Sequence, residues 1–155
     1  MKTLILGLGN PIRGDDGVGL RVAQALESRL NQEQDVTVME ASIAGLDFLE
    51  LLSDQSRVII IDAIQTKDGK AGQIYRLQPE ALNATRHITT PHDLDFASVL
   101  ELGKKLGLAL PKEIIIFGIE VKDVNSFSEK CTPEVEQAIP VCVEMVIQEL
   151  DESHG

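Results

Sequence analysis

Four short runs of continuously apolar residues, rich in β-branched side chains, recur along the chain. They span residues 4–6, 36–39, 58–61 and 114–117. Such runs are typical of strands that are buried on both faces of a parallel sheet. A fifth segment, residues 73–77, alternates polar with apolar positions and predicts a half-exposed strand at an edge of the sheet.

Apolar residues at helical spacing occupy the intervals between these strands. The pattern predicts helices over residues 18–30, 46–52, 91–106 and 133–150. Thr132 and Pro133 suit the N-cap and first turn of the last helix, and we expect Pro140 to kink it. Strands that alternate with helices predict an α/β fold. We expect a three-layer α/β/α sandwich around a mostly parallel, twisted sheet of about five strands, in which one edge strand can be antiparallel.

Composition narrows the class of protein. The 155 residues are 43% hydrophobic and 25% charged, which is ordinary for one folded domain spanning residues 1–155. The formal net charge of −11 argues against nucleic-acid binding, because that affinity depends on Lys and Arg. No apolar run approaches the roughly 20 residues of a membrane span. Asn10, Pro11 and Arg13 interrupt the apolar start before it resembles a signal peptide.

The number and spacing of the cysteines indicate a protein of a reducing compartment. Cys131 and Cys142 form neither a disulfide framework nor a Cys-x-x-Cys metal motif. Cys142 falls on the apolar face of the last predicted helix, so we expect it in the core. A reduced, cytoplasmic protein is the simplest interpretation, and we expect a monomer.

Polar residues gather where the predicted strands end. Asp16 follows the first strand, Glu40 and Asp62 end the second and third, and Glu120 follows the fourth. His92 lies at the start of the third predicted helix. Ligands of open α/β sheets bind outside the carboxyl ends of the strands, so these five side chains are candidates for one site. A metal cation is the simplest way to hold several carboxylates together.

Asp16, Asp62 and His92 would make a metal site of two carboxylates and one imidazole with open coordination positions. That mixture suits a catalytic or guest-accepting divalent metal, but it does not choose nickel over zinc, iron or manganese. The alternatives are structural: Asp16 can favour a helix N-terminus, Asp62 can cap a loop, and His92 can be a first-turn helix residue. We expect His87 and His154 at the surface.

The glycine-rich segment 7–19 joins the first strand to the first helix. It is not the Gly-x-Gly-x-x-Gly dinucleotide motif, because Gly14 comes too late and Asp15 and Asp16 stand where a pyrophosphate would lie. We expect its small residues to bring the backbone and Asp16 close to a bulky guest. The chain has no Gly-x-Ser-x-Gly elbow and no Cys–His pair that the sequence supports, so no protein nucleophile stands out.

Five motifs together resemble one enzyme family, the nickel–iron hydrogenase maturation endopeptidases. The motifs lie at residues 7–19 (GLGNPIRGDDGVG), 61–63 (IDA), 91–92 (PH), 117–120 (FGIE) and 131–135 (CTPEV). They cover nearly the whole chain in the family's order. The resemblance implies a protease that removes a C-terminal extension from the nickel-loaded large-subunit precursor of a nickel–iron hydrogenase. The precursor is then the partner, and neither nucleic acid nor a membrane is expected.

The resemblance also implies roles for single residues. Asp16, Asp62 and His92 match the family's metal-binding and catalytic positions, with Glu40 as a further contributor. The metal implied is nickel carried by the substrate, for which zinc or cadmium can substitute. Asp16 stands where relatives frequently have glutamate. Glu40 stands where aspartate is common, and residues 41–43 (ASI) replace the usual Gly-Gly-Thr, which changes the pocket there.

Water activated by the metal or by a carboxylate would attack the scissile carbonyl, unless the metal serves only for recognition. Two other functions remain open at this point. The chain can be a nickel-binding assembly factor without catalysis. Residues 7–11 (GLGNP) also open peptidyl-tRNA hydrolases, but that match stops at Pro11, and the net charge of −11 suits tRNA poorly.

Overall fold

The computed structural model describes residues 2–41, 46–79, 88–89, 96–124 and 126–152. Its main sheet has five strands in the spatial order β2-β1-β3-β6-β4. Their bounds are Thr3–Leu8 (β1), Val36–Ala41 (β2), Arg57–Thr66 (β3), Ile74–Leu77 (β4) and Glu113–Glu120 (β6). β2, β1, β3 and β6 are parallel neighbours, and β4 runs antiparallel to β6 at the edge. The predicted fold class is confirmed, including its antiparallel edge strand.

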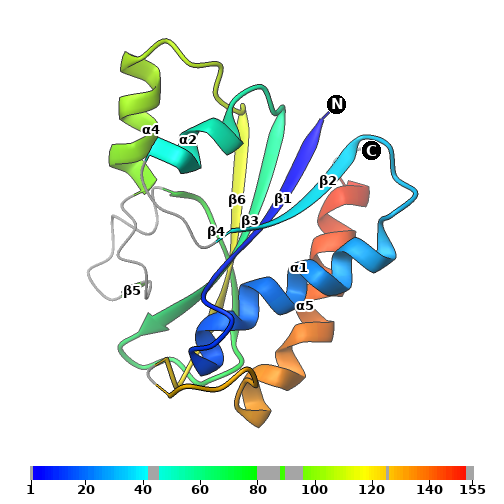
Figure 1. Ribbon diagram of the computed structural model, residues 1–155, viewed down its shortest axis with the longest axis vertical. Helices are drawn as coiled ribbons and strands as arrows, with labels where there is room; N and C mark the ends of the chain where they lie inside the picture. Colours follow the sequence, from blue (N-terminus) through cyan, green and yellow to red (C-terminus); the bar gives the residue numbers. More distant parts are fainter. Residues whose placement is uncertain (1, 42–45, 80–87, 90–95, 125, 153–155) are drawn as a thin grey trace.

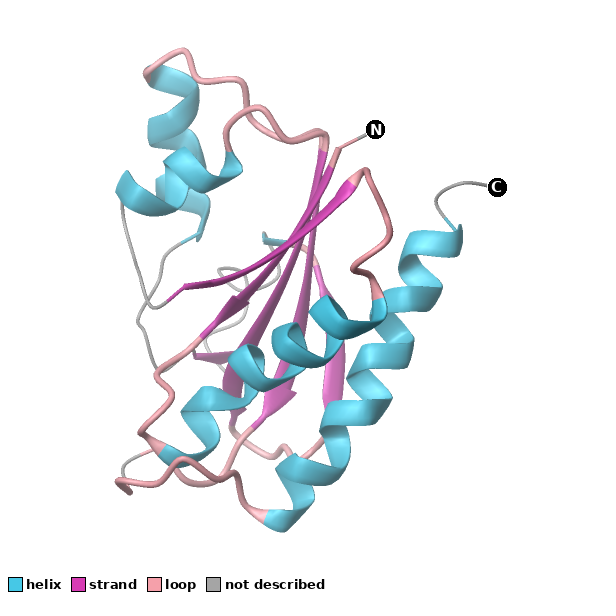
Figure 2. Ribbon diagram, turned by 45° about the vertical axis from the view of Figure 1, so that its right-hand side comes forward, coloured by secondary structure: helices cyan, strands magenta, loops and turns pink. Residues whose placement is uncertain are grey.

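Helices cover both faces of the sheet (Figures 1 and 2). One face packs against α1 (Val18–Arg29) and α5 (Pro133–Glu152), which contact each other. The other face packs against α2 (Leu46–Leu52) and α4 (Phe96–Lys105). Side chains alternate between faces along each strand, which explains why the predicted strands are apolar throughout.

The third predicted helix is described only in part. α4 is described from Phe96, and its predicted first turn near Pro91 lies outside the described residues. α5 begins at Pro133 as predicted and continues through Pro140 to Glu152. No helix within the described ranges is long and apolar enough to cross a membrane.

β3 is longer than the apolar run that predicted it. The sequence placed the strand end at Asp62, but β3 continues to Thr66. Asp62 pairs with Gly118 of β6, and the pairing with β6 extends to Ile64. A two-residue strand that the sequence did not indicate, β5 (Ile88–Thr89), pairs antiparallel with the end of β3. Pairing with β6 and β5 therefore extends β3 beyond Asp62.

Glycines let the first helix lie directly on the sheet. A Cβ at Gly7 would be 2.3 Å from the carbonyl oxygen of Gly19. A Cβ at Gly19 would lie 2.4 Å from the oxygen of Leu8 and 2.5 Å from that of Ile61. Only glycine permits so close an approach of backbone to backbone. The small residues thus bring α1 and the 3-10 turn before it, η1 (Gly14–Gly17), against the ends of β1 and β3.

Candidate active site at the carboxyl edge of the sheet

Asp62 lies where β1 leaves the sheet. The last β1–β3 pair is Gly7 with Ile61, so Asp62 is the first residue of β3 beyond that ladder. Ile60 belongs to the α2/α4 side of the core and Ile61 to the α1/α5 side, which places Asp62 on the α2/α4 face. Its side chain is fully buried, and its Oδ1 accepts the backbone N–H of Ala63 at 2.8 Å.

Asp16 reaches the same edge from η1. It is 1% exposed, its N–H donates to the carbonyl of Arg13 at 3.1 Å, and its own carbonyl accepts from Asn10 at 3.3 Å. The backbone on either side is therefore fixed. η1 and β3 are in contact, so two buried carboxylates belong to touching elements at one edge of the sheet. Nearby buried carboxylates repel each other, and a cation or a shared proton relieves that repulsion.

Asp15, the neighbour of Asp16, is a residue whose role sequence reasoning missed. Its fully buried carboxylate accepts the N–H groups of Lys122, Asp123 and Thr132 at 3.0, 2.9 and 2.6 Å. The Thr132 hydroxyl also donates to it, at 3.0 Å to Oδ2. Asp15 thereby joins η1 to the β6–α5 loop and to the start of α5. Its partners are more than a hundred residues away, so no local pattern indicates them.

The two cysteines are poor nucleophiles in this setting. Burial, with the negative charges of Asp15 and Glu136, raises the pKa of the Cys131 thiol to about 11. Burial alone raises the pKa of Cys142 to about 12. Because the thiolate is the reactive form, both groups stay protonated and unreactive at neutral pH. Neither thiol is therefore a candidate for the attacking group.

The other two candidate carboxylates, Glu40 and Glu120, have different positions from Asp16 relative to Asp62. Glu40 is exposed and pairs with Gly7, on the α1 face of the sheet rather than the face of Asp62. Glu120 is 3% exposed and shares the face of Asp62. Its Oε2 and Oε1 accept the N–H and the hydroxyl of Thr66 at 2.9 and 2.5 Å, which holds the end of β3. The structure therefore places Asp16 and Asp62 on touching elements, and it places Glu40 on the opposite face of the sheet from Asp62.

The third predicted ligand, His92, lies outside the described residues, as do His87 and His154. Within the described ranges, no group of three His, Cys, Asp or Glu side chains is placed to hold a metal ion. Two carboxylates at touching elements supply part of the donor set that a divalent metal accepts. The complete trio of Asp16, Asp62 and His92 stays a prediction.

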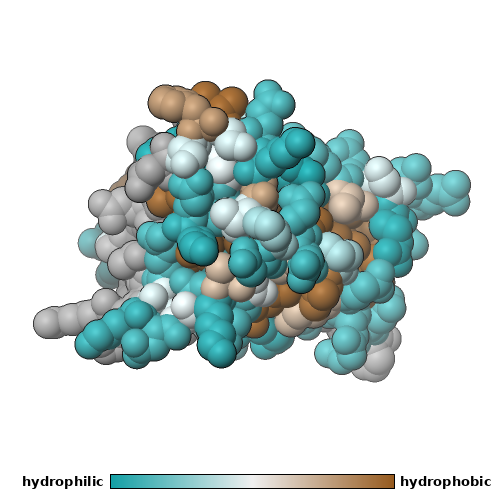
Figure 3. Space-filling view, turned by 90° about the horizontal axis from the view of Figure 1, so that it is seen from below, coloured by the Kyte–Doolittle hydropathy of each residue, from teal (hydrophilic) through white to brown (hydrophobic). Residues whose placement is uncertain are grey.

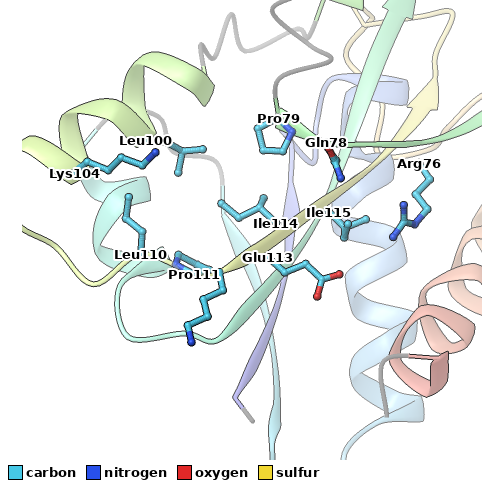
Figure 4. A pocket seen from close by; sticks show the side chains of 11 residues that line it. Arg76, Gln78, Pro79, Leu100, Lys104, Leu110, Pro111, Glu113, Ile114 and Ile115 are labelled. Atoms are coloured by element: carbon cyan, nitrogen blue, oxygen red, sulfur yellow. The ribbon is translucent and has the colours of Figure 1, made fainter. Parts of the chain in front are cut away.

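Two cavities lie at opposite ends of the sheet. A cavity of about 460 Å³ adjoins the β3–β4 turn, next to Thr66 and Tyr75, at the carboxyl edge. A second cavity, of about 520 Å³, lies between β4, the start of β6 and α4, with Lys104 and Lys112 among its lining residues (Figure 4). Because β6 begins there, this second cavity is at the amino edge of the parallel strands. Neither Asp16 nor Asp62 lines it.

The fold and this edge describe a small α/β protein with an acidic site, and comparison with known proteins gives its family. The family model described as "Hydrogenase maturation protease" matches residues 20–149. The "Hydrogenase 2 maturation protease" of Escherichia coli K12 is 32% identical over 155 residues, covering 99% of this chain and 93% of the relative. The chain belongs to the hydrogenase maturation protease family, a family of endopeptidases, which confirms the resemblance.

Solved structures agree with this assignment. The hydrogenase maturating endopeptidase HybD from E. coli has a TM-score of 0.82 and 29% identity, covering 99% of this chain and 94% of that one. The [NiFe] hydrogenase maturation protease HybD from Thermococcus kodakarensis has a TM-score of 0.70 and 25% identity, covering 96% and 98%. The arrangement of strands and helices described above is therefore the family's arrangement.

Proposed function

We propose that this chain is a cytoplasmic endopeptidase that removes the C-terminal extension of the nickel-loaded large-subunit precursor of a nickel–iron hydrogenase. The observation that carries the proposal is the pair of buried carboxylates, Asp16 and Asp62, on touching elements of a hydrogenase maturation protease fold. Nickel enters as part of the substrate, and zinc or cadmium is expected to substitute. The chain acts as a monomer.

In this proposal, Asp16, Asp62 and His92 bind the nickel that the precursor already carries. A precursor without nickel then lacks the anchor that brings its scissile bond to this edge. Water adds to the scissile carbonyl, a carboxylate accepts its proton, and the C–N bond breaks as that proton passes to the leaving amine. Nickel supplies either recognition alone or, in addition, polarisation of the water or the carbonyl.

The test is cleavage of nickel-loaded precursor by the purified chain, followed by intact mass. Asp62→Asn keeps the side-chain volume but removes a charge, so we expect the rate to fall at least 100-fold, on the order of the loss of one catalytic acid–base group. Glu101→Gln, an exposed change on α4, is the matched control and should cleave normally. Undiminished cleavage by Asp62→Asn, with its fold intact by circular dichroism, would contradict the assigned site.

A nickel-binding assembly factor without catalysis is the second candidate. It would bind the precursor through the same residues and leave its mass unchanged. The family assignment favours the endopeptidase over this candidate and over a peptidyl-tRNA hydrolase.

A further inference from the structure

Two large apolar side chains are exposed beside the candidate site. Phe127 is 88% exposed and Ile12 is 49% exposed. Their loops are joined: the N–H of Ser128 donates to the carbonyl of Ile12 at 2.9 Å, and the N–H of Gly14 donates to the carbonyl of Ser128 at 2.9 Å. We call this feature, Ile12 with Phe127, the apolar knob. Folding leaves most of the apolar surface of Phe127 in contact with water, so this surface is available for burial against a partner.

The knob is held in place by its own loop. The N–H of Ser126 donates to Oδ1 of Asp123 at 3.1 Å, and the N–H of Lys130 donates to the hydroxyl of Ser128 at 3.1 Å. Asp123 is in turn bound to the carboxylate of Asp15 through its N–H. Phe127 is thus presented on a braced loop, which lowers the entropy that a partner must overcome on binding.

The knob is continuous with the candidate site. Ile12 lies four residues before Asp16, and the intervening turn is closed by the bond from the N–H of Asp16 to the carbonyl of Arg13. Seen from the carboxyl edge of the parallel strands, apolar atoms protrude from an otherwise largely polar rim (Figure 3). The loop that carries Phe127 is therefore hydrogen-bonded to the segment that leads into Asp16, and a chain segment that reaches Asp16 comes close to the knob.

The small apolar area of the knob limits the kind of partner that can bind it. An aromatic side chain covers roughly 150–250 Å², so two apolar side chains fall well short of the roughly 1,200 Å² or more that a stable dimer buries. The knob is too small to hold a second copy of this chain, but it fits one or two apolar side chains of an extended segment.

We propose that the apolar knob binds an apolar side chain of the precursor in the extended segment that flanks the scissile bond. This inference rests on the proposed function, and it adds a docking contact that acts on substrate binding rather than on chemistry. It also explains why the two loops are braced through Asp15: the same carboxylate fixes Phe127 relative to Asp16.

The test compares Phe127→Ser with a matched change of another exposed apolar residue, Leu106→Ser, at the end of α4. Leu106 is 59% exposed and directly follows α4, in the segment that leads to the amino end of β6. For nickel-loaded precursor, we expect Phe127→Ser to raise KM and the calorimetric Kd about tenfold or more with kcat nearly unchanged. Phe127→Leu should recover most of the affinity, and Leu106→Ser should behave as wild type.

Each outcome bears on one of the two proposals. If wild type cleaves and Phe127→Ser matches it in KM and Kd within twofold, the docking inference is overturned and the proposed function stands. If wild type binds the precursor without cleaving it, the proposed function fails, while a weaker Kd for Phe127→Ser still supports docking. A concentration-dependent wild-type dimer in sedimentation that Phe127→Ser dissolves would overturn the inference.

Discussion

Adjacent aspartates in this protein have different roles because their surroundings differ. The Asp15 carboxylate accepts donors from both ends of the β6–α5 loop, whereas Asp16 is held by backbone hydrogen bonds in η1, which contacts β3. Sequence reasoning found Asp16 and Asp62 from their positions after apolar strands. It could not find the role of Asp15, because the donors lie 107 to 117 residues further along the chain.

Replacing Asp15 with Asn tests its role in joining the loops. The amide keeps the shape but loses the charge and turns one acceptor into a donor that faces backbone N–H groups. We expect a loss of about 2–4 kcal/mol in the free energy of unfolding, since hydrogen bonds to charged groups are worth roughly 1.5–3 kcal/mol each and do not add fully. Urea denaturation measures this, with Glu129→Gln on the same loop as the control. A change below about 0.5 kcal/mol, within the range of ordinary surface substitutions, would contradict the account.

Cys131 should be a slow thiol in the folded protein. Its pKa is raised from 9.0 to about 11, so at pH 8 its thiolate fraction is about 100-fold below that of an unshifted thiol. Alkylation by iodoacetamide, read by peptide mass, should be correspondingly slow and should accelerate as the pH approaches 11. The raised pKa favours the protonated thiol in the fold, so this stability contribution is present below pH 9 and is lost between about pH 9 and 11.

Fast alkylation of folded Cys131 at pH 8 would contradict this description. A second readout is cleavage itself: Cys131→Ala should process the precursor normally, because the thiol is not the nucleophile.

At the scale of elements, the apolar runs predicted where the strands lie but not where they end. Asp62 interrupts the run at 58–61, yet pairing with β6 and with β5 carries β3 to Thr66. The face of Glu40 also depends on register, since its pairing with Gly7 places it on the side of α1. Pairing partners of this kind are distant in sequence, so a local pattern cannot give strand ends or faces beyond the apolar run itself.

The contact of α1 with the sheet depends on Gly19. A methyl group there would meet the carbonyl oxygens of Leu8 and Ile61 at 2.4 and 2.5 Å, and both are backbone atoms that cannot rotate away. We expect Gly19→Ala to lower the free energy of unfolding by about 1–3 kcal/mol or more, as overpacking does. Gly17→Ala is the milder comparison, because its nearest neighbour would lie at 3.3 Å, a tight contact that a small shift relieves. Equal thermal denaturation midpoints for the two variants would contradict the packing argument.

At the scale of the whole molecule, the candidate site lies at the carboxyl edge of a sheet whose buried residues are mostly apolar. Asp16 and Asp62 are buried there, and Phe127 extends into solvent from the loop that is hydrogen-bonded to Asp15. The formal net charge of −11 is spread over the chain, so only a few of its 25 acidic residues take part in this site. The resemblance predicted the family and the acidic pair, while the knob and the braced loops became visible only in the fold.

The most direct measurement of the central claim is the intact mass of nickel-loaded large-subunit precursor after incubation with this chain. We expect a single loss equal to the mass of the C-terminal extension with wild type and with Glu101→Gln, and no loss with Asp62→Asn. A precursor that keeps its full mass with wild type, although it binds the chain, would contradict it.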